Sequence, residues 1–158
     1  MLCLAGGEII MAKHTNAAAP KAYTNSHSSY NASITPISED KKAILETIKE
    51  LDLIMKNKDY NSWLNYVTPQ SIDYWKQKPH LQAVSARLPG NKIQLKTLED
   101  YFNWVFRLSR QNARVDEIRY ISSKLVKAVQ VSGNQDIIYY QFEKQNGRWL
   151  ISLDTNDI

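Results

Sequence analysis

Residues 136–154, DIIYYQFEKQNGRWLISLD, contain two alternating apolar segments with a turn signal between them. The turn signal is Asn146-Gly147, the dipeptide that best tolerates the positive φ angles of a two-residue hairpin turn. We therefore predict an antiparallel hairpin in this part of the chain. Because side chains alternate along a strand, one face of the hairpin is expected to close the core. That face carries Ile138, Tyr140, Phe142, Trp149, Ile151 and Leu153.

Two more segments with a period of two precede the hairpin. They are residues 115–122 (VDEIRYIS) and 124–131 (KLVKAVQV), with short turn signals around them. Upstream of Arg110 the apolar residues recur at helical spacing instead. Helices followed by an antiparallel meander predict an α+β fold. In this fold the N-terminal helices pack on a curved, cone-like antiparallel sheet, and the four strands form a C-terminal meander.

Capping residues mark where the predicted helices begin. Ser38, which precedes two acidic residues, predicts the start of a first helix that ends at NKDY, residues 57–60. A second helix is expected to carry Val67, and a third starts at Thr68 with a proline in its first turn. Thr97 caps a further helix that extends to about residue 110. Proline and glycine residues are expected to break the chain between the last two of these predicted helices.

Composition limits the classes of function. The chain has 158 residues, of which 43% are hydrophobic and 23% charged, values that are ordinary for a soluble domain. The net charge of +4 is smaller than nucleic-acid binders usually concentrate on one face, so nucleic acid is not expected as a partner. A single cysteine, Cys3, excludes an internal disulfide and a multi-cysteine metal site. There is no phosphate loop, dinucleotide fingerprint, histidine pair at metal spacing or nucleophile elbow, so we expect no cofactor and no metal.

The first part of the chain differs from the rest. Residues 1–37 are rich in Ala, Asn, Ser and Thr without helical or strand period, which predicts a disordered leader or tether before a single domain over residues 38–158. The initial MLCLAGGEII is similar to a degenerate export signal, although Cys3 has too few residues before it for a good lipoprotein signal. Export to the cell envelope and a cytoplasmic location with a misassigned start both remain open, and we favour export. No segment is long and apolar enough for a transmembrane helix.

Two stretches carry a resemblance to a known family. The first is DYNSWLNYVTP over residues 59–69, which follows the first predicted helix, and the second is YYQFEKQNGRWLISL over residues 139–153. The layout resembles the nuclear-transport-factor-2-like (cystatin-like α+β cone) superfamily, in its small bacterial envelope or lipoprotein-type branch, over residues 38–154. This resemblance implies a cone with an open mouth. Members include isomerases, dehydratases and cyclases as well as domains that only bind or dimerise, so the fold alone does not choose between catalysis and binding.

The carboxylates and the histidine of the ordered region are the candidates for catalysis. His80 is the only histidine in that region and is expected in a loop, KPHLQ, where Asp73 or Asp100 could form a dyad with it. The alternative is a solvent-exposed histidine without a partner. Asp52 on the first helix could border the edge of the core, and Asp154 closes the last strand. The alternative for both is a solvated carboxylate.

Aromatic residues supply candidates for a ligand-binding pocket. A phenol hydroxyl can donate a hydrogen bond into a pocket, while aromatic residues at helical or strand spacing more commonly pack in the core or at its rim. The candidates for binding a small apolar ligand are Tyr66, Tyr74, Tyr101 and Trp104, and Tyr140 is a further possible donor.

A basic cluster indicates a possible anion site. The sequence RLSRQNARVDEIR, residues 107–119, places arginines at a helix C-terminus and in the loop behind it. Arginine suits bidentate recognition of carboxylate or phosphate, but basic side chains at a helix C-terminus also complement the helix dipole without any ligand. The candidate anion-binding residues are Arg107, Arg110, Arg114 and Arg119.

The other face of the hairpin predicts a contact with a partner. Ile137 and Tyr139 on one strand and Leu150 on the next alternate away from the predicted core and are more apolar than a solvated face usually is. We predict a homodimer or a contact with another partner through this face. Taken together, these features favour a non-catalytic domain of the cell envelope that binds a small ligand or a protein partner. The alternative is a cone-type enzyme, such as an isomerase, dehydratase or hydrolase, that acts by general acid–base catalysis.

Overall fold

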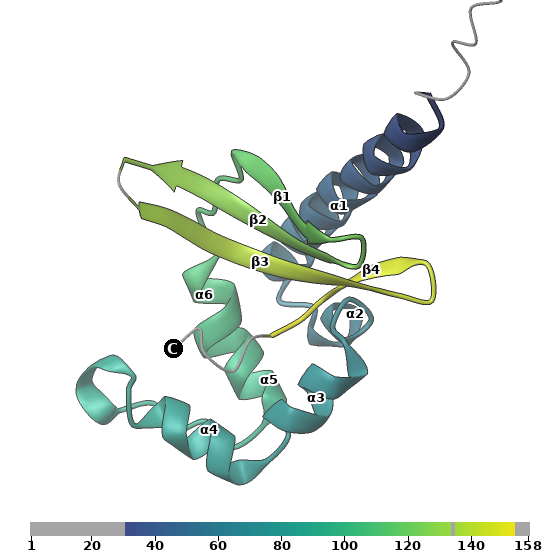
Figure 1. Cartoon of the computed structure of the whole chain (residues 1–158). Coiled ribbons are helices and arrows are strands. Elements are labelled where there is room, and N and C mark those ends of the chain that lie inside the picture. Colours follow the sequence, from purple (N-terminus) through teal and green to yellow (C-terminus); the bar gives the residue numbers. More distant parts are fainter. Residues whose placement is uncertain (1–30, 134, 154–158) are drawn as a thin grey trace, which may run out of the picture.

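The chain folds as helices followed by one antiparallel sheet, which confirms the predicted α+β class (Figure 1). The computed structural model describes residues 31–133 and 135–153. The helical part consists of α1 (Asn31–Asn57), α2 (Tyr60–Leu64), α3 (Pro69–Trp75), α4 (Lys78–Ser85), the short η1 (Pro89–Asn91), α5 (Leu98–Tyr101), η2 (Phe102–Phe106) and α6 (Arg107–Ser109). The strands are β1 (Glu117–Ser122), β2 (Leu125–Ser132), β3 (Gln135–Gln145) and β4 (Arg148–Ile151).

The sheet has the meander order β1-β2-β3-β4, and each pair is antiparallel. The last two strands are joined by the predicted two-residue turn, since Gln145 pairs with Arg148. Asn146 and Gly147 have φ angles of 50° and 78°. These left-handed conformations are why the turn needs this dipeptide.

The predicted core face of β3 is wrong at one position, because the strand contains a β-bulge. Tyr140, Phe142, Trp149, Ile151 and Leu153 are buried as expected, but Ile138 is 40% exposed. The reason is that Ala128 pairs with Tyr140 and Val129 with Ile138, which leaves Tyr139 as an extra residue in β3. Strict alternation therefore stops at the bulge. Tyr139, predicted to face away from the core, packs against it.

The helical part differs from prediction in three places. The first helix already includes Asn31, upstream of the predicted cap at Ser38, because an exposed polar residue is tolerated inside a helix as well as at its cap. Val67 is outside α2 and forms an isolated bridge with Ile151. The segment around Pro79, predicted as a break, is α4, because proline is compatible with the first turn of a helix.

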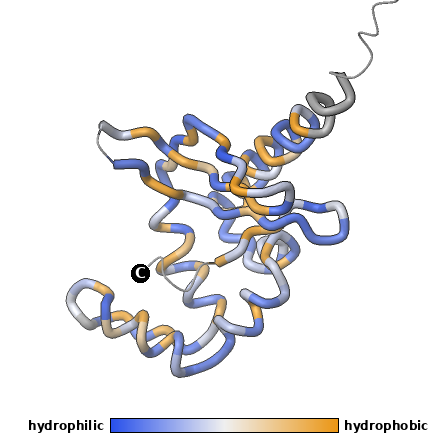
Figure 2. Tube along the Cα trace, in the orientation of Figure 1, coloured by the Kyte–Doolittle hydropathy of each residue, from blue (hydrophilic) through white to orange (hydrophobic). Residues whose placement is uncertain are grey.

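Aromatic side chains fill the space between the sheet and the helices. The helical segment α5–η2–α6 passes under one face of the sheet, and apolar residues alternate with polar ones along the helices and strands (Figures 1 and 2). Trp63 lies with its ring 5.0 Å from that of Phe102 and 5.1 Å from that of Phe106. Phe106 in turn contacts Tyr140, and Tyr140 stacks on Phe142. The central space is thus occupied by rings, and any cavity must lie at its edge.

Candidate ligand site: an arginine cleft at the edge of the core

A cleft of about 290 Å³ lies between α1 and the end of α6. We call it the arginine cleft. It is lined by Asp52, Met55 and Lys56 from α1 and by Arg107, Arg110, Gln111 and Ala113 from α6 and the loop after it. Three of the lining side chains are basic and one is acidic, so the cleft favours an anion.

Arg107, one of the residues that line the cleft, carries a buried donor. It is the first residue of α6, directly after the π-helical turn η2. Its Nε is buried and has no hydrogen-bond partner among residues 31–133 and 135–153. A buried donor without an acceptor costs free energy, on the order of 1–3 kcal/mol, and native proteins seldom keep one without a reason.

Arg110 is held in place by the protein. Its Nε donates to the carbonyl oxygen of Tyr139 at 2.7 Å, and a second guanidinium nitrogen donates to Ser109 Oγ at 2.9 Å. The guanidinium carbon lies 4.2 Å from the centre of the Phe106 ring and 5.5 Å from that of Tyr140. These cation–π contacts fix a positive charge at the wall of the cleft.

Asp52 is the acidic residue of the cleft. Burial raises the pKa of its carboxyl group, and the positive charge of Lys56, one helical turn further along α1, offsets part of the rise. Asp52 is therefore more easily neutralised than an exposed aspartate. A protonated Asp52 would increase the positive character of the cleft.

Tyr140 lies in the core behind the cleft. Its side chain is 1% exposed, and its hydroxyl has no hydrogen-bond partner within the described part of the chain. Burial raises the pKa of Tyr140 above that of an ordinary tyrosine; the charge of Arg110 opposes the rise and that of Asp52 adds to it. Tyr140 consequently stays a neutral donor, electrostatically coupled to two residues of the cleft.

The four predicted anion-binding arginines separate into two pairs. Arg107 and Arg110 line the arginine cleft, as described above. Arg114 forms an ion pair with Asp116 at 2.9 Å. Arg119 is ion-paired with acidic residues at the sheet surface, namely Glu117 and Asp136.

The predicted catalytic residues occupy separate places. His80 lies on α4 rather than in a loop, and its ring is 3.6 Å from that of Tyr74. Asp100 accepts hydrogen bonds from the backbone N–H groups of residues 96 and 97 and completes a capping box at the start of α5. Asp73 is exposed. No hydrogen bond or ion pair joins His80 to either carboxylate within the described residues, and Asp154 lies outside them.

The predicted aromatic ligand residues do not converge on one cavity. Tyr66 donates to Glu50 Oε2 at 2.8 Å and lines a shallow surface cavity of about 370 Å³ between α1 and α2. Tyr101 is buried and stacks on Trp75 at 4.5 Å. Tyr74 packs on His80, and Trp104 is exposed.

Lys56 was not identified from the sequence as a site residue. Its position one turn after Asp52 could have marked the pair, because residues four apart share a helix face. The sequence does not show that Asp52 and Lys56 lie beside the arginines of α6. That proximity depends on how α1 packs against a segment about fifty residues further along the chain.

Two absences concern only the part of the chain that the structure describes. There, no three His, Cys, Asp or Glu side chains are grouped so that they could hold a metal ion. Among the helices described, none has the length and apolarity needed to cross a membrane.

Comparisons with known proteins give one relationship. An uncharacterised lipoprotein of Treponema pallidum (strain Nichols) is 32% identical to this chain over 109 residues, which is 69% of this chain. The chain spans 58% of the length of that relative. No family model matches the chain and no solved structure matches it, so the resemblance to the nuclear-transport-factor-2-like superfamily rests on layout and on the terminal hairpin.

Proposed function

We propose that this chain is a non-catalytic domain of the cell envelope that binds a small organic anion in the arginine cleft. The observation that carries the proposal is the buried Nε of Arg107, beside the fixed positive charge of Arg110. A carboxylate or phosphate oxygen would satisfy that donor and be stabilised by both charges. The volume of about 290 Å³ limits the ligand, or the part of it that enters, to a small group.

Two features favour binding over catalysis. The space under the sheet is filled by aromatic rings, so polar groups do not converge there. His80, Asp73 and Asp100 are engaged elsewhere or exposed, as described above. The enzymatic alternative would have to use Asp52, whose raised pKa in a cleft is typical of a general acid.

The location in the envelope is supported by the likeness to a lipoprotein. On this proposal the N-terminal residues form a tether before the folded domain. Cell fractionation, followed by mass measurement of the mature N-terminus, tests it directly. Recovery of an unprocessed terminus in the cytoplasmic fraction would contradict the envelope location without affecting the proposal for the cleft.

Binding in the cleft can be tested by titrating the full chain with acetate, succinate and inorganic phosphate, and with neutral succinamide. Two-dimensional NMR is suitable because it locates the response. We expect the anions to shift signals of Lys56 and residues 107–113, and succinamide to leave them unchanged. If none of the anions shifts these signals, the proposal fails.

Two variants separate specific contacts from overall charge. Arg107→Gln should weaken anion binding about tenfold or more, equivalent to about 1.4 kcal/mol, because it removes a buried charged donor. Arg114→Gln removes the same charge from an exposed residue that is paired with Asp116 and should leave binding nearly unchanged. An equal loss in both variants would indicate long-range attraction only.

A second function, self-association, is favoured by the β2–β3 end of the sheet. This end projects beyond the helices (Figure 1), and Val131, Ile137 and Ile138 on it are each at least 40% exposed. The set of residues proposed for the dimer contact therefore differs from the set predicted from the sequence. Tyr139 packs against the core and donates a hydrogen bond to Gln130, so Ile138 replaces it as the residue available for a dimer contact.

A further inference from the structure

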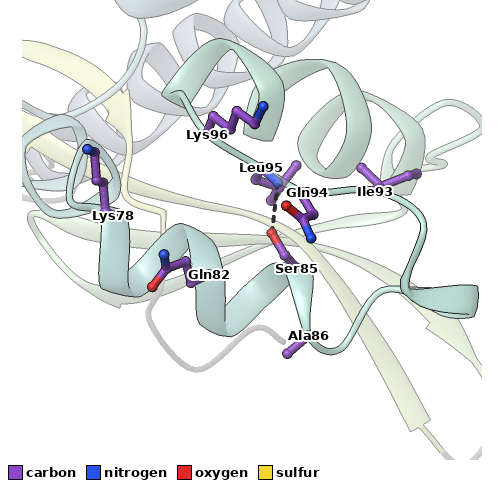
Figure 3. Close-up of a pocket in the computed structure, with 8 residues that line it drawn as sticks. All are labelled: Lys78, Gln82, Ser85, Ala86, Ile93, Gln94, Leu95 and Lys96. Carbon is purple, nitrogen blue, oxygen red and sulfur yellow. Dashed lines mark hydrogen bonds between the residues drawn. The ribbon is translucent and has the colours of Figure 1, made fainter.

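A further cavity, larger than the two described above, lies beside α4. It has a volume of about 660 Å³ and is a partly open cavity between α4 and the extended segment 93–96 (Figure 3). We call it the α4 groove. It is lined by Lys78, Gln82, Ser85, Ala86, Ile93, Gln94, Leu95 and Lys96, and it shares no residue with the arginine cleft.

The two walls of the groove are fixed to each other and to the core. Ser85 Oγ accepts a hydrogen bond from the N–H of Leu95 at 2.8 Å (Figure 3). The same hydroxyl donates a hydrogen bond to the carbonyl of Leu81 at 2.8 Å. Leu81 and Leu95 are both buried in the core cluster. The N–H of Lys96 is held at 2.9 Å by the carboxylate of Asp100. The groove is therefore built by structural contacts on both sides, and its shape is pre-formed.

Its lining is graded from charged to apolar. Lys78 and Lys96 lie at one end, and Ala86 and Ile93 at the other, with Gln82 on the α4 wall between them (Figure 3). Neither lysine is in an ion pair within residues 31–133 and 135–153. Among the residues that the structure describes, the lining of the groove includes no acidic side chain. The nearby Asp100 carboxylate accepts hydrogen bonds from backbone N–H groups, and the charge of Lys96 also helps to lower the pKa of that carboxyl.

From this arrangement we infer that the α4 groove binds a small amphiphile with one anionic head and a short alkyl chain, such as a medium-chain carboxylate. The head would meet the two lysines, and the chain would lie along Leu95, Ile93 and Ala86. The volume is within the range of roughly 300–1,000 Å³ of sites for small organic ligands. This site is distinct from the arginine cleft, and its ligand differs from the small anion proposed there by needing an apolar chain.

The test uses the full chain and a series of alkyl carboxylates: hexanoate, octanoate and decanoate, each below its micelle concentration. Neutral 1-octanol and cationic octyltrimethylammonium are the controls. We expect affinity to rise about two- to fourfold per added methylene, because each partly enters an apolar wall. Octanoate should bind about tenfold more tightly than octanol, and the cation should not bind. NMR signals of residues 78–86 and 93–96 should respond.

Variants distinguish the groove from other surfaces. Lys78→Gln with Lys96→Gln should weaken octanoate binding about tenfold or more, because it removes both cations from the head site. The matched control, Lys41→Gln with Lys42→Gln, changes net charge equally on exposed positions of α1 and should bind like the wild type. Ala86→Trp should block decanoate more than hexanoate by filling the apolar end.

Three results would overturn the inference. The first is equal affinity for octanoate and octanol, and the second is an unchanged affinity in the double lysine variant with its fold verified by thermal unfolding. The third is a response confined to the arginine cleft, which would leave the anion proposal standing and assign no ligand to the groove. Conversely, a response at the groove with none at the cleft would support this inference and contradict the proposed function.

Discussion

Trp149 donates a hydrogen bond from its indole Nε1 to Asp40 Oδ1 at 3.1 Å, across 109 positions of the sequence. Lys144 binds the same oxygen at 2.7 Å, and its ammonium lies 5.3 Å from the centre of the Trp149 ring. A single carboxylate on α1 thus joins both strands of the C-terminal hairpin. The hairpin closes the core and also attaches the first helix to the sheet.

Asp40→Asn should make the stability of this junction independent of pH. Burial opposes ionisation of Asp40, but hydrogen bonds from Lys144 and Trp149, together with the Lys144 charge, hold the pKa of the carboxyl below the ordinary 3.8. A lowered folded-state pKa stabilises the protein above the unfolded-state pKa, and the contribution is lost as pH falls through the folded-state pKa. We expect Asp40→Asn to cost about 1 kcal/mol at neutral pH.

Denaturation at a series of pH values checks this expectation. The difference in free energy of unfolding between wild type and Asp40→Asn should be constant around neutral pH. It should shrink once the pH falls below about 4. Glu39→Gln is the control, since Glu39 is exposed and precedes Asp40 on the same helix. A difference that persists unchanged to low pH would show that the carboxylate charge is not responsible.

Two substitutions at Trp149 separate packing from hydrogen bonding. Trp149→Ala should lower the free energy of unfolding by about 3–5 kcal/mol, because it removes a large buried side chain from the core. Trp149→Phe keeps most of the apolar surface and loses the bond to Asp40, so it should cost less, about 1–2 kcal/mol. Urea denaturation of both variants measures the two contributions. Equal losses in the free energy of unfolding would mean that the ring of Trp149 contributes little beyond the hydrogen bond of its indole N–H.

The hairpin turn offers a test of backbone conformation alone. Gly147 has a φ angle of 78°, and a Cβ added there would meet no atom within 4 Å. Gly147→Ala should therefore cost about 1–2 kcal/mol solely through the left-handed conformation. Gly147→Asn should cost less, because asparagine tolerates this region better. Thermal unfolding of the two variants provides the comparison, and a neutral Gly147→Ala would contradict the assigned turn.

The strands were predictable because their signals are local. Alternation and the Asn-Gly turn specify the hairpin within a single stretch of chain, and observed strand ends lie close to those predicted. The exposure of Ile138 was not predictable, because the bulge at Tyr139 arises from pairing with β2. The helix containing His80 was missed because a proline in its first turn has the same appearance in sequence as a proline that ends a helix.

The arginine cleft was predictable only in part, because local sequence signals do not show which distant segments pack together. Arg107 and Arg110 were identified because they are close in sequence and belong to one residue type. Their separation from Arg114 and Arg119 depends on acidic partners just before β1 and in the strands. The walls of the α4 groove come from segments about ten residues apart that have no shared motif. Its recognition required the bond between Ser85 and Leu95.

Arg107 and Arg110 should respond differently to replacement by methionine. Arg107→Met removes a buried donor that has no partner among the described residues, so we expect unchanged or higher stability, by up to about 1 kcal/mol, together with loss of anion binding. Arg110→Met removes the hydrogen bonds of the guanidinium to Tyr139, Ser109 and Phe106 and its contacts with two rings, and should cost about 1–3 kcal/mol. Chemical denaturation compares them. A large loss in Arg107→Met would assign that residue to the scaffold instead.

The projecting end of the sheet should form the contact in a homodimer. Ile138 and Val131, each 40% exposed, share one face of this end of the sheet, and Ile137, 44% exposed, lies on the other face. In a two-fold dimer each patch would face its own copy, so a substitution acts twice. Ile137→Lys with Ile138→Glu should leave the fold intact, because neither residue belongs to the core, and should produce a monomer.

The control is Ile121→Lys, at an exposed position of β1 outside this end of the sheet, and this variant should remain a dimer. Sedimentation velocity decides the matter: a wild-type protein that stays monomeric at high micromolar concentration excludes the dimer.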